Sequence, residues 1–205
     1  MNNAPHRETP QTVLDFWFED ALTDPAKLGQ RMKVWFGGGP AVDAVLAQRF
    51  GDLVDTLAAE RADDWAAQGP LQRLAAIIAL DQFSRSIHRK SPKAYVNDPI
   101  ALRLAKEAIA QGQDREIPPI GRMFVYLPLE HSENVEDQRT SVRLFAALAT
   151  EATAGTKETF DSALDYARRH AEVIERFGRF PHRNDVLGRA STPEEAAWVK
   201  AHGGF

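Results

Sequence analysis

Three polar stretches of this sequence contain the residue types that carry out acid–base chemistry or bind anions. In the first, Asp81 and Arg85 follow an apolar run at 74–80. On a helix, Asp81 shares the core-facing side of Ile77 and Ile78, which lie four and three residues before it. Arg85 lies one turn further along that face. Because an unpaired buried charge is costly, two interpretations stay open: Asp81 and Arg85 pair to join helices, or Asp81 contributes to a ligand or metal pocket.

The second stretch begins at Glu130 and combines carboxylates with an imidazole. Glu130, His131 and Glu133 are close neighbours in the chain, and a carboxylate beside a histidine suits general acid–base catalysis or a hard metal ion. The spacing differs from His-Glu-x-x-His and from the Glu-x-x-His of di-iron bundles, so we predict no metal ion and no cofactor. Alternatively, Ser132 or Asn134 caps the next helix, and Glu133 is placed favourably at its positive end.

The third stretch is an irregular segment with several cationic side chains. Arg179, His182 and Arg183, followed by Arg189, form a local positive patch in a chain that is acidic overall. A guanidinium group offers paired donors to a carboxylate or phosphate. Alternatively, these side chains bond to carbonyls and carboxylates of adjoining helices and hold the segment in place. His170, on the flank of a core-facing stripe, is interpreted either as a core residue or as part of a pocket.

The elements that must position these residues are all helices, because alternating β-branched runs are absent while helix start and stop signals recur. Proline is favoured at the first helical position, and glycine is favoured just after the last one. Pro128 is expected to end a short helix, since proline has no backbone donor. The expected helices cover about 10–18, 25–35, 40–60, 70–84, 98–112, 119–127, 134–153 and 156–178, with a last one from 192.

About eight or nine helices with short connections predict an all-α fold in which the helices form an antiparallel array. Of the residues, 43% are hydrophobic and 26% are charged, which is typical of a globular protein. We find no break in composition, so a single helical domain is expected over 1–205, with a flexible N-terminal segment at 1–9.

Composition also limits the partners. The 25 basic and 29 acidic side chains give a net charge of -4, which disfavours binding to nucleic acids. The absence of cysteine excludes disulfides, thiolate metal sites and cysteine nucleophiles. The longest apolar run is far shorter than the roughly 20 residues that cross a bilayer, and no secretory signal is recognised. We therefore expect a cytoplasmic protein that does not interact with membranes.

Five motifs in the same order resemble a bacterial family catalogued as domain of unknown function 924. They are Val-Leu-Asp-Phe-Trp-Phe at 13–18, Trp-Phe-Gly at 35–37, Leu-Asp-Gln-Phe at 80–83, Tyr-Leu-Pro-Leu-Glu-His-Ser-Glu at 126–133 and Phe-Gly-Arg-Phe-Pro-His-Arg-Asn at 177–184. The resemblance implies a tetratricopeptide-like right-handed superhelix and no established function. The sequence departs from the family where Ser84-Arg85-Ser86 replaces Pro-Arg-Asn, which retains the arginine.

Three hypotheses for function follow. In the first, the helices form a polar pocket that binds a small anionic ligand or an acidic peptide end. In the second, the protein is an acid–base hydrolase or lyase that uses Glu130 and His131, with an arginine that holds the substrate anion. In the third, the polar motifs are structural, and the protein acts through a partner surface. The candidate pocket residues are Asp81, Arg85, Glu130, His131, His170, Arg179, His182 and Arg183.

Overall fold

A computed structural model describes residues 8–204, and helices are the only regular secondary structure in that part of the chain. The predicted all-α class is therefore confirmed. Most of the expected flexible segment 1–9 lies outside the described residues, and Thr9 caps the first helix. No helix in the described range is long and apolar enough to span a bilayer.

The first half of the chain forms helices α1 to α6, two pairs of which are joined by π-helical turns. The elements are α1 (Pro10–Phe18), α2 (Leu28–Trp35), α3 (Pro40–Thr56) with the turn Leu57–Arg61 and α4 (Ala62–Ala66), and α5 (Pro70–Ile78) with the turn Ala79–Phe83 and α6 (Ser84–Ile87). Each π-helical turn joins its two helices into one continuous helix, and these two continuous helices end a few residues after the predicted ends at 60 and 84. When each of them is counted as one helix, the number of helices in the described residues agrees with the eight or nine expected.

The second half forms the helices α7 (Asp98–Ala110), α8 (Pro119–Glu130), α9 (Val135–Thr150), α10 (Lys157–Phe177) and α11 (Pro193–His202). The predicted helix signals are present. The Asn134 side chain caps α9, and Thr192 and Glu195 form a capping box on α11. Gly178 ends α10 in the left-handed conformation, with a φ of 69°.

The predicted break at Pro128 is wrong, because α8 continues through this residue to Glu130. Proline lies in the last turn of the helix, where it removes only one backbone donor. The helical bond from the His131 N–H to the Leu127 carbonyl, 2.9 Å long, forms after it. Glu130 and His131 therefore occupy the rigid end of a helix, which fixes the direction of their side chains.

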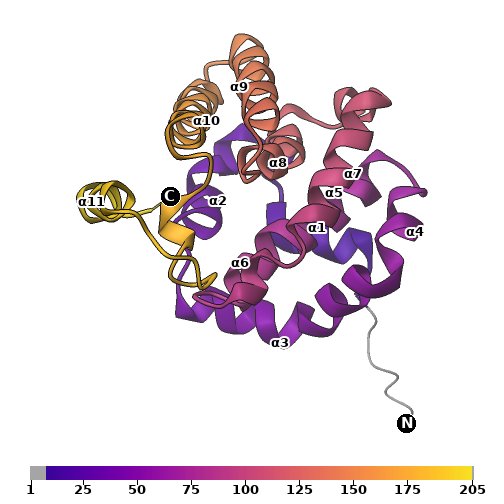
Figure 1. The fold of residues 1–205 in the computed structure, drawn as a ribbon. Helices are drawn as coiled ribbons and strands as arrows, with labels where there is room; N and C mark the ends of the chain where they lie inside the picture. The colour runs from indigo at the N-terminus through magenta and orange to yellow at the C-terminus, as the bar shows by residue number, and fades with distance from the viewer. Residues whose placement is uncertain (1–7, 205) are drawn as a thin grey trace.

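The core is built around α5, whose side chains at 74–80, including the start of the following turn, are wholly buried. This helix packs against α1, α4, α7 and α8 (Figure 1). Beside it, an aromatic cluster joins α1, α2 and α8: the ring centroids of Trp17 and Trp35 are 6.1 Å apart, and those of Trp35 and Phe124 are 4.8 Å apart. Large buried aromatic side chains of this kind hold α2 firmly against α8.

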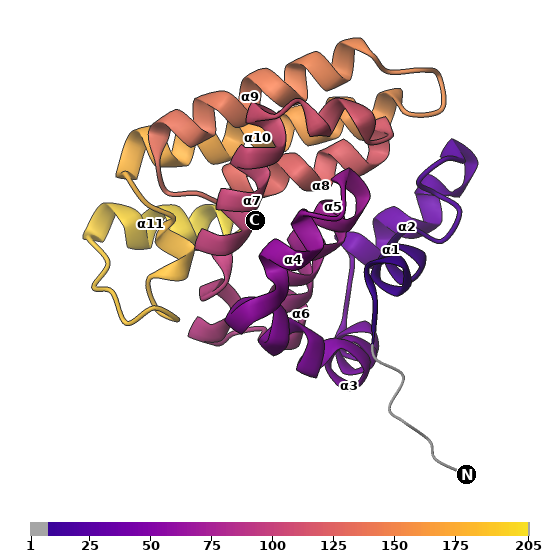
Figure 2. The same cartoon turned by 90° about the vertical axis from the view of Figure 1, so that its right-hand side faces the viewer.

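The helices α8, α9 and α10 pack in sequence, with α9 and α10 side by side along one edge of the molecule (Figures 1 and 2). Because short connections make successive helices antiparallel, α8 and α10 run in the same direction. The ends of these two helices lie close together, and the segment that follows α10 turns back toward α6 before α11 begins (Figure 1). The tetratricopeptide-like superhelix stays a prediction.

Candidate functional site

A cavity of about 540 Å³ lies between α2, α6, α8, α10 and the segment that follows α10. Its size falls within the range of about 300–1,000 Å³ that is typical of small-molecule sites. Phe36 and Tyr166 stand on its walls with exposed fractions of 54% and 45%. The candidate residues from all three polar stretches of the sequence meet at this cavity.

Asp81 is positioned by the π-helical turn Ala79–Phe83, which inserts one extra residue into the helix. The side chain is 1% exposed and has three partners: the Gln82 amide donates to it at 2.6 Å, His131 Nδ1 is 2.8 Å away and Arg85 Nη1 is 2.9 Å away. Burial raises the pKa of Asp81, but the charge of Arg85 and the hydrogen bonds from His131 and Gln82 outweigh burial and hold that pKa well below its ordinary value. Asp81 is therefore a carboxylate.

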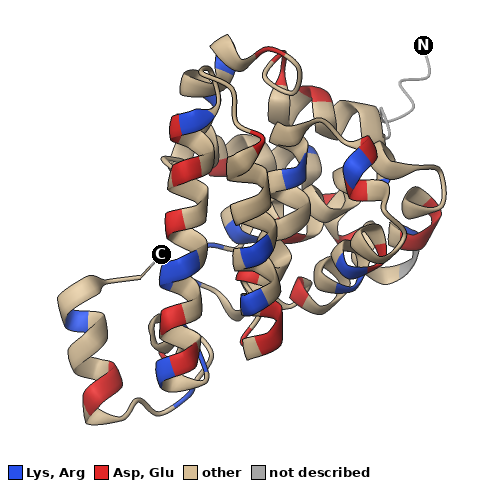
Figure 3. Ribbon diagram, turned by 90° about the horizontal axis from the view of Figure 1, so that it is seen from above, with Lys and Arg blue, Asp and Glu red and all other residues tan. Residues whose placement is uncertain are grey.

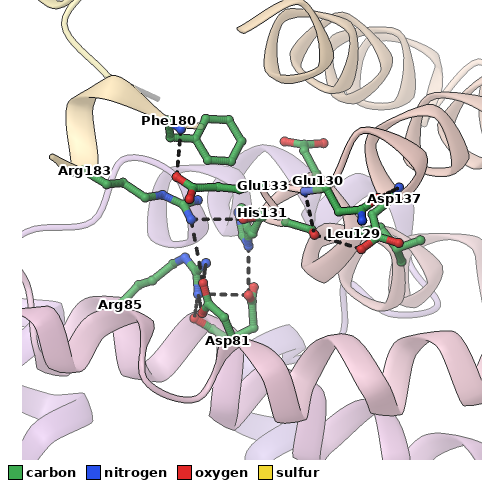
Figure 4. Close-up of polar contacts among 12 residues, drawn as sticks. Asp81, Arg85, Leu129, Glu130, His131, Glu133, Asp137, Phe180 and Arg183 are labelled. Carbon is green, nitrogen blue, oxygen red and sulfur yellow. Dashed lines mark hydrogen bonds and ion pairs between the residues drawn. The ribbon is translucent and has the colours of Figure 1, made fainter. Parts of the chain in front are cut away.

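His131 caps the C-terminal end of α8 and faces this carboxylate (Figure 4). An ionised carboxylate can only accept a hydrogen bond, so Nδ1 of His131 carries the proton and Nε2 keeps its lone pair. Burial, followed by the charge of Arg85, lowers the pKa of His131. The imidazole is therefore neutral near pH 7 and has the properties of a base on the cavity wall.

Arg85 joins the two acidic residues of the cluster. Its Nη1 and Nη2 atoms donate to Asp98 at 2.9 and 3.0 Å, and Nη1 also donates to the backbone carbonyl of Asp81 at 2.8 Å. Burial tends to lower the pKa of Arg85, but Asp81 and Asp98 raise it overall. The predicted pairing of Asp81 with Arg85 is therefore present. Arg85 lines the cavity, whereas Asp81 is buried behind the lining residues.

Arg183 approaches from the segment after α10 and is 6% exposed. Its guanidinium lies 4.9 Å from the ring centroid of Tyr95 and 4.3 Å from that of Phe180. Nη1 donates to the His131 carbonyl at 3.0 Å, whereas Nε has no hydrogen-bond partner among the described residues. Burial, followed by the charge of Arg85, lowers the pKa of Arg183 to about 10. The group is still a cation at neutral pH.

Glu130 and His170 form a second contact on the same cavity. Glu130 Oε1 lies 3.3 Å from His170 Nδ1, which is also 2.9 Å from the Tyr166 carbonyl oxygen. Burial, with the negative charge of Asp81, raises the pKa of Glu130 to about 8. Burial, followed by His131, lowers the pKa of His170 to about 3. At neutral pH this contact joins a protonated acid and a neutral imidazole, so it is not an ion pair.

Glu130 and His131 are neighbours in sequence but point in different directions. Figure 4 shows the imidazole of His131 turned toward Asp81, while the Glu130 carboxyl group points away from this cluster. Both residues nevertheless line the cavity. His182 lines it as well, and burial, followed by the charge of Arg183, lowers the pKa of His182 to about 4. The cavity wall therefore presents a neutral acid and neutral imidazoles.

Arg179 is the candidate residue that lies apart from both the cavity lining and the Asp81–His131 cluster. It donates to both carboxylate oxygens of Glu195, at 2.6 and 2.8 Å, and to the Ala190 carbonyl at 2.9 Å. Arg189 likewise holds Glu133, at 2.7 and 3.0 Å, and that carboxylate also accepts the Phe180 N–H at 2.8 Å. The interpretation that loop arginines hold the segment in place fits these two residues.

Three further residues of the site were not among the candidates from the sequence. Asp98 bonds to Arg85, Tyr95 lies beside Arg183, and Lys90 lines the cavity. The sequence marked Asp98 only as part of a helix start before a proline. Asp98 comes thirteen residues after Arg85, and this spacing in the sequence does not predict that the two side chains pair. Among residues 8–204, no group of three or more His, Asp or Glu side chains is arranged to hold a metal ion.

The chain matches a family model described as a bacterial protein of unknown function (DUF924) over residues 13–203. It is also similar to the solved structure of the protein of unknown function ATU0120 from Agrobacterium tumefaciens, with 33% sequence identity and a TM-score of 0.77. That match covers 94% of this chain and 97% of the other. No curated protein matches the chain significantly. Since the family model spans almost the whole chain, the chain belongs to the bacterial DUF924 family, whose function is unknown.

Proposed function

We propose that the cavity binds a small organic molecule with an anionic group, and that Arg183 holds this anion. The observation that carries the proposal is the state of the Arg183 side chain. It is a buried cation on the cavity wall, and the carboxylate paired with it, Asp98, lies 3.8 Å from Nη1 and is already bound by both Nη atoms of Arg85. A buried charge with so distant a partner costs free energy, and an anion in the cavity would pair with it through a charge-assisted bond.

The charges around the cavity support an anion. The carboxylates of Asp81 and Asp98 are held by Arg85, with Asp98 also 3.8 Å from Arg183 Nη1, and the pKa of Glu130, raised to about 8, keeps that group neutral at pH 7. Lys90 lines the cavity and forms no ion pair with another described residue. The three cations Arg85, Lys90 and Arg183 therefore outnumber the two carboxylates Asp81 and Asp98, although basic and acidic residues are mixed along the helices in the view of Figure 3.

Titration with small carboxylates and inorganic phosphate tests this proposal. We expect at least one of these anions to raise the Tm of the wild-type protein and to bind Arg183→Met about ten- to a hundredfold more weakly, because one charge-assisted hydrogen bond contributes about 1.5–3 kcal/mol. Arg179→Met is the matched control, since this arginine pairs with Glu195 away from the cavity. Calorimetric titration, at a temperature where circular dichroism shows all three proteins folded, gives the affinities.

The proposal fails if no small carboxylate or phosphate binds the wild type. It also fails if Arg183→Met binds the anion as tightly as the wild type does, or if Arg179→Met loses as much affinity as Arg183→Met.

A second candidate function, acid–base hydrolysis, is favoured by the contact of 2.8 Å between Asp81 and His131. This contact leaves Nε2 of His131 as a base on the cavity that also holds the protonated Glu130. In such a reaction, Nε2 would remove a proton from water, the oxygen of that water would attack an ester carbonyl, and Glu130 would protonate the leaving oxygen. The products are a carboxylic acid and an alcohol.

Hydrolysis of aryl esters tests this second candidate. We expect the wild type to hydrolyse such an ester above the buffer rate, and His131→Gln to lower kcat by about 10²–10⁴, as for loss of a general base. His202→Gln, an exposed change on α11, should keep the rate. The absence of turnover by the wild type, or equal losses in the two variants, would contradict the role of His131.

A further inference from the structure

We infer that the ligand of this cavity is amphipathic: a carboxylate joined to an extended apolar body that lies along α8 and α10. The inference rests on the proposed binding of an organic anion and names the class of that anion. The inference is based on a change from apolar to polar side chains along the cavity wall. This change is a separate observation from the charge and the volume of the cavity.

The change from apolar to polar follows α8. Met123, Leu127 and Glu130 all line the cavity, and their spacing of four and three residues places them on one face of the helix. Seven residues at 1.5 Å each separate the backbone positions of Met123 and Glu130 by about 10 Å along the helix. The lining therefore changes from apolar to polar along the direction of α8.

The parallel helix α10 forms an uncharged wall of the cavity. Its lining residues are Thr159, Ser162, Ala163, Tyr166 and His170, and His170 lies against Glu130 at the polar end. The residues of α10 that line the cavity carry no formal charge, because burial lowers the pKa of His170 to about 3. The change from apolar to polar therefore comes from α8, while α10 offers uncharged side chains along its length.

The apolar end is completed by side chains from α2 and α9. Met32, Trp35 and Phe36 of α2 and Phe145 of α9 line the cavity. The contact of Trp35 with Phe124, at 4.8 Å between ring centroids, places it beside the N-terminal half of α8. Thioether and aromatic groups adapt to alkyl chains and flat rings of different shape.

The cavity walls also expose apolar surface to solvent, and a bound ligand would cover this surface. Phe36 is 54% exposed and Tyr166 is 45% exposed, and both border the cavity. Large apolar side chains exposed around a polar recess are typical of binding grooves. At the opposite end, the Arg183 guanidinium lines the cavity as the cation for the carboxylate, and the protonated Glu130 can donate a further hydrogen bond. A carboxylate with an alkyl or aryl body satisfies both ends.

The test is a titration of wild-type protein with acetate, butyrate, hexanoate and octanoate, and with octanol and octylammonium as controls for the charge. We expect affinity to rise by up to about fourfold for each added methylene, which corresponds to ~0.8 kcal/mol per buried methylene. Octanol and octylammonium should bind more weakly than octanoate. In Met32→Gln the gain from acetate to octanoate should shrink, while Leu71→Gln, a change at a partly exposed residue of α5 outside the cavity lining, should keep it.

The outcomes separate the two proposals. If acetate or phosphate binds but affinity does not increase with chain length, the amphipathic ligand is wrong, and the binding of an anion still holds. If octanol or octylammonium binds as tightly as octanoate, the assignment of a carboxylate is wrong. If none of these anions binds, the proposed function fails together with this inference. An equal gain in Met32→Gln and wild type would contradict the placement of the apolar body beside α2.

Discussion

Replacing Asp81 with alanine will lower the free energy of unfolding by about 3–5 kcal/mol, the range observed when one partner of a buried ion pair is removed. The carboxylate is 1% exposed and contacts Arg85, His131 and Gln82. Its loss leaves a buried guanidinium and a buried amide with fewer partners. It also removes the acceptor that fixes the proton on Nδ1 of His131. Urea denaturation followed by circular dichroism measures the change.

Asp161→Ala is the matched control for this experiment. Asp161 accepts a bond from Lys157 at 2.7 Å, but the side chains are 50% and 68% exposed. Exposed pairs of this spacing contribute about 0.3–0.5 kcal/mol. Should Asp81→Ala leave too little folded protein, Asp81→Asn keeps the shape of the side chain and should still lose stability. A loss of under about 1 kcal/mol for Asp81→Ala would show that the cluster is not held by this carboxylate.

Glu130→Gln will change how stability depends on pH. The pKa of Glu130 is raised to about 8 in the folded protein, mainly by burial, and lies near 4.3 in an unfolded chain. The folded state therefore holds this proton more tightly. The resulting stabilisation is fully present below the unfolded pKa and is lost as pH rises to about 8. The stability of the variant relative to the wild type should rise by a few kcal/mol between pH 5 and pH 9.

Urea denaturation of both proteins across this range provides the measurement. The lowered pKa values of His170 and His182 reduce stability as the pH falls below about 6.5, but both proteins share this effect. A carbon-13 NMR titration of side-chain carboxyl groups gives an independent check, because one signal with a midpoint near pH 8 should disappear in Glu130→Gln. A midpoint near pH 4–5 for Glu130, with equal pH profiles for the two proteins, would contradict the assignment of a neutral acid.

The helical fold could be predicted because its signals are local. Thr9, Asn134, Thr192 and Gly178 mark helix ends through the geometry of their own backbone and side chains, and the structure places helix ends at all of them. Pro128 misled the prediction since a proline within a helix removes one backbone donor but does not always end the helix, and α8 continues through it to Glu130. The π-helical turns have no comparable sequence signal.

The arrangement of the candidate site could be predicted only in part. The Asp81–Arg85 pair lies within one helical turn, so its spacing predicts the contact. The contact of Asp81 with His131 joins residues 50 positions apart and depends on how α8 packs against α5. Arg179 and Arg183 look equivalent in sequence, yet one bonds to α11 and the other enters the cavity wall. That difference arises from the path of the chain after Gly178, which composition does not specify.

The π-helical turn at Ala79–Phe83 also makes the register of the chain important at this point. Deleting a single residue from it would restore regular α-helical winding, but it would rotate α6 by about 100° relative to α5 and to α7, which packs on α5. Arg85 would then face away from Asp98, although both residues would still be present. Shortening this helix by one residue should therefore break the contact between Arg85 and Asp98 without substituting either residue. A point substitution, in contrast, leaves the π-helical turn in place.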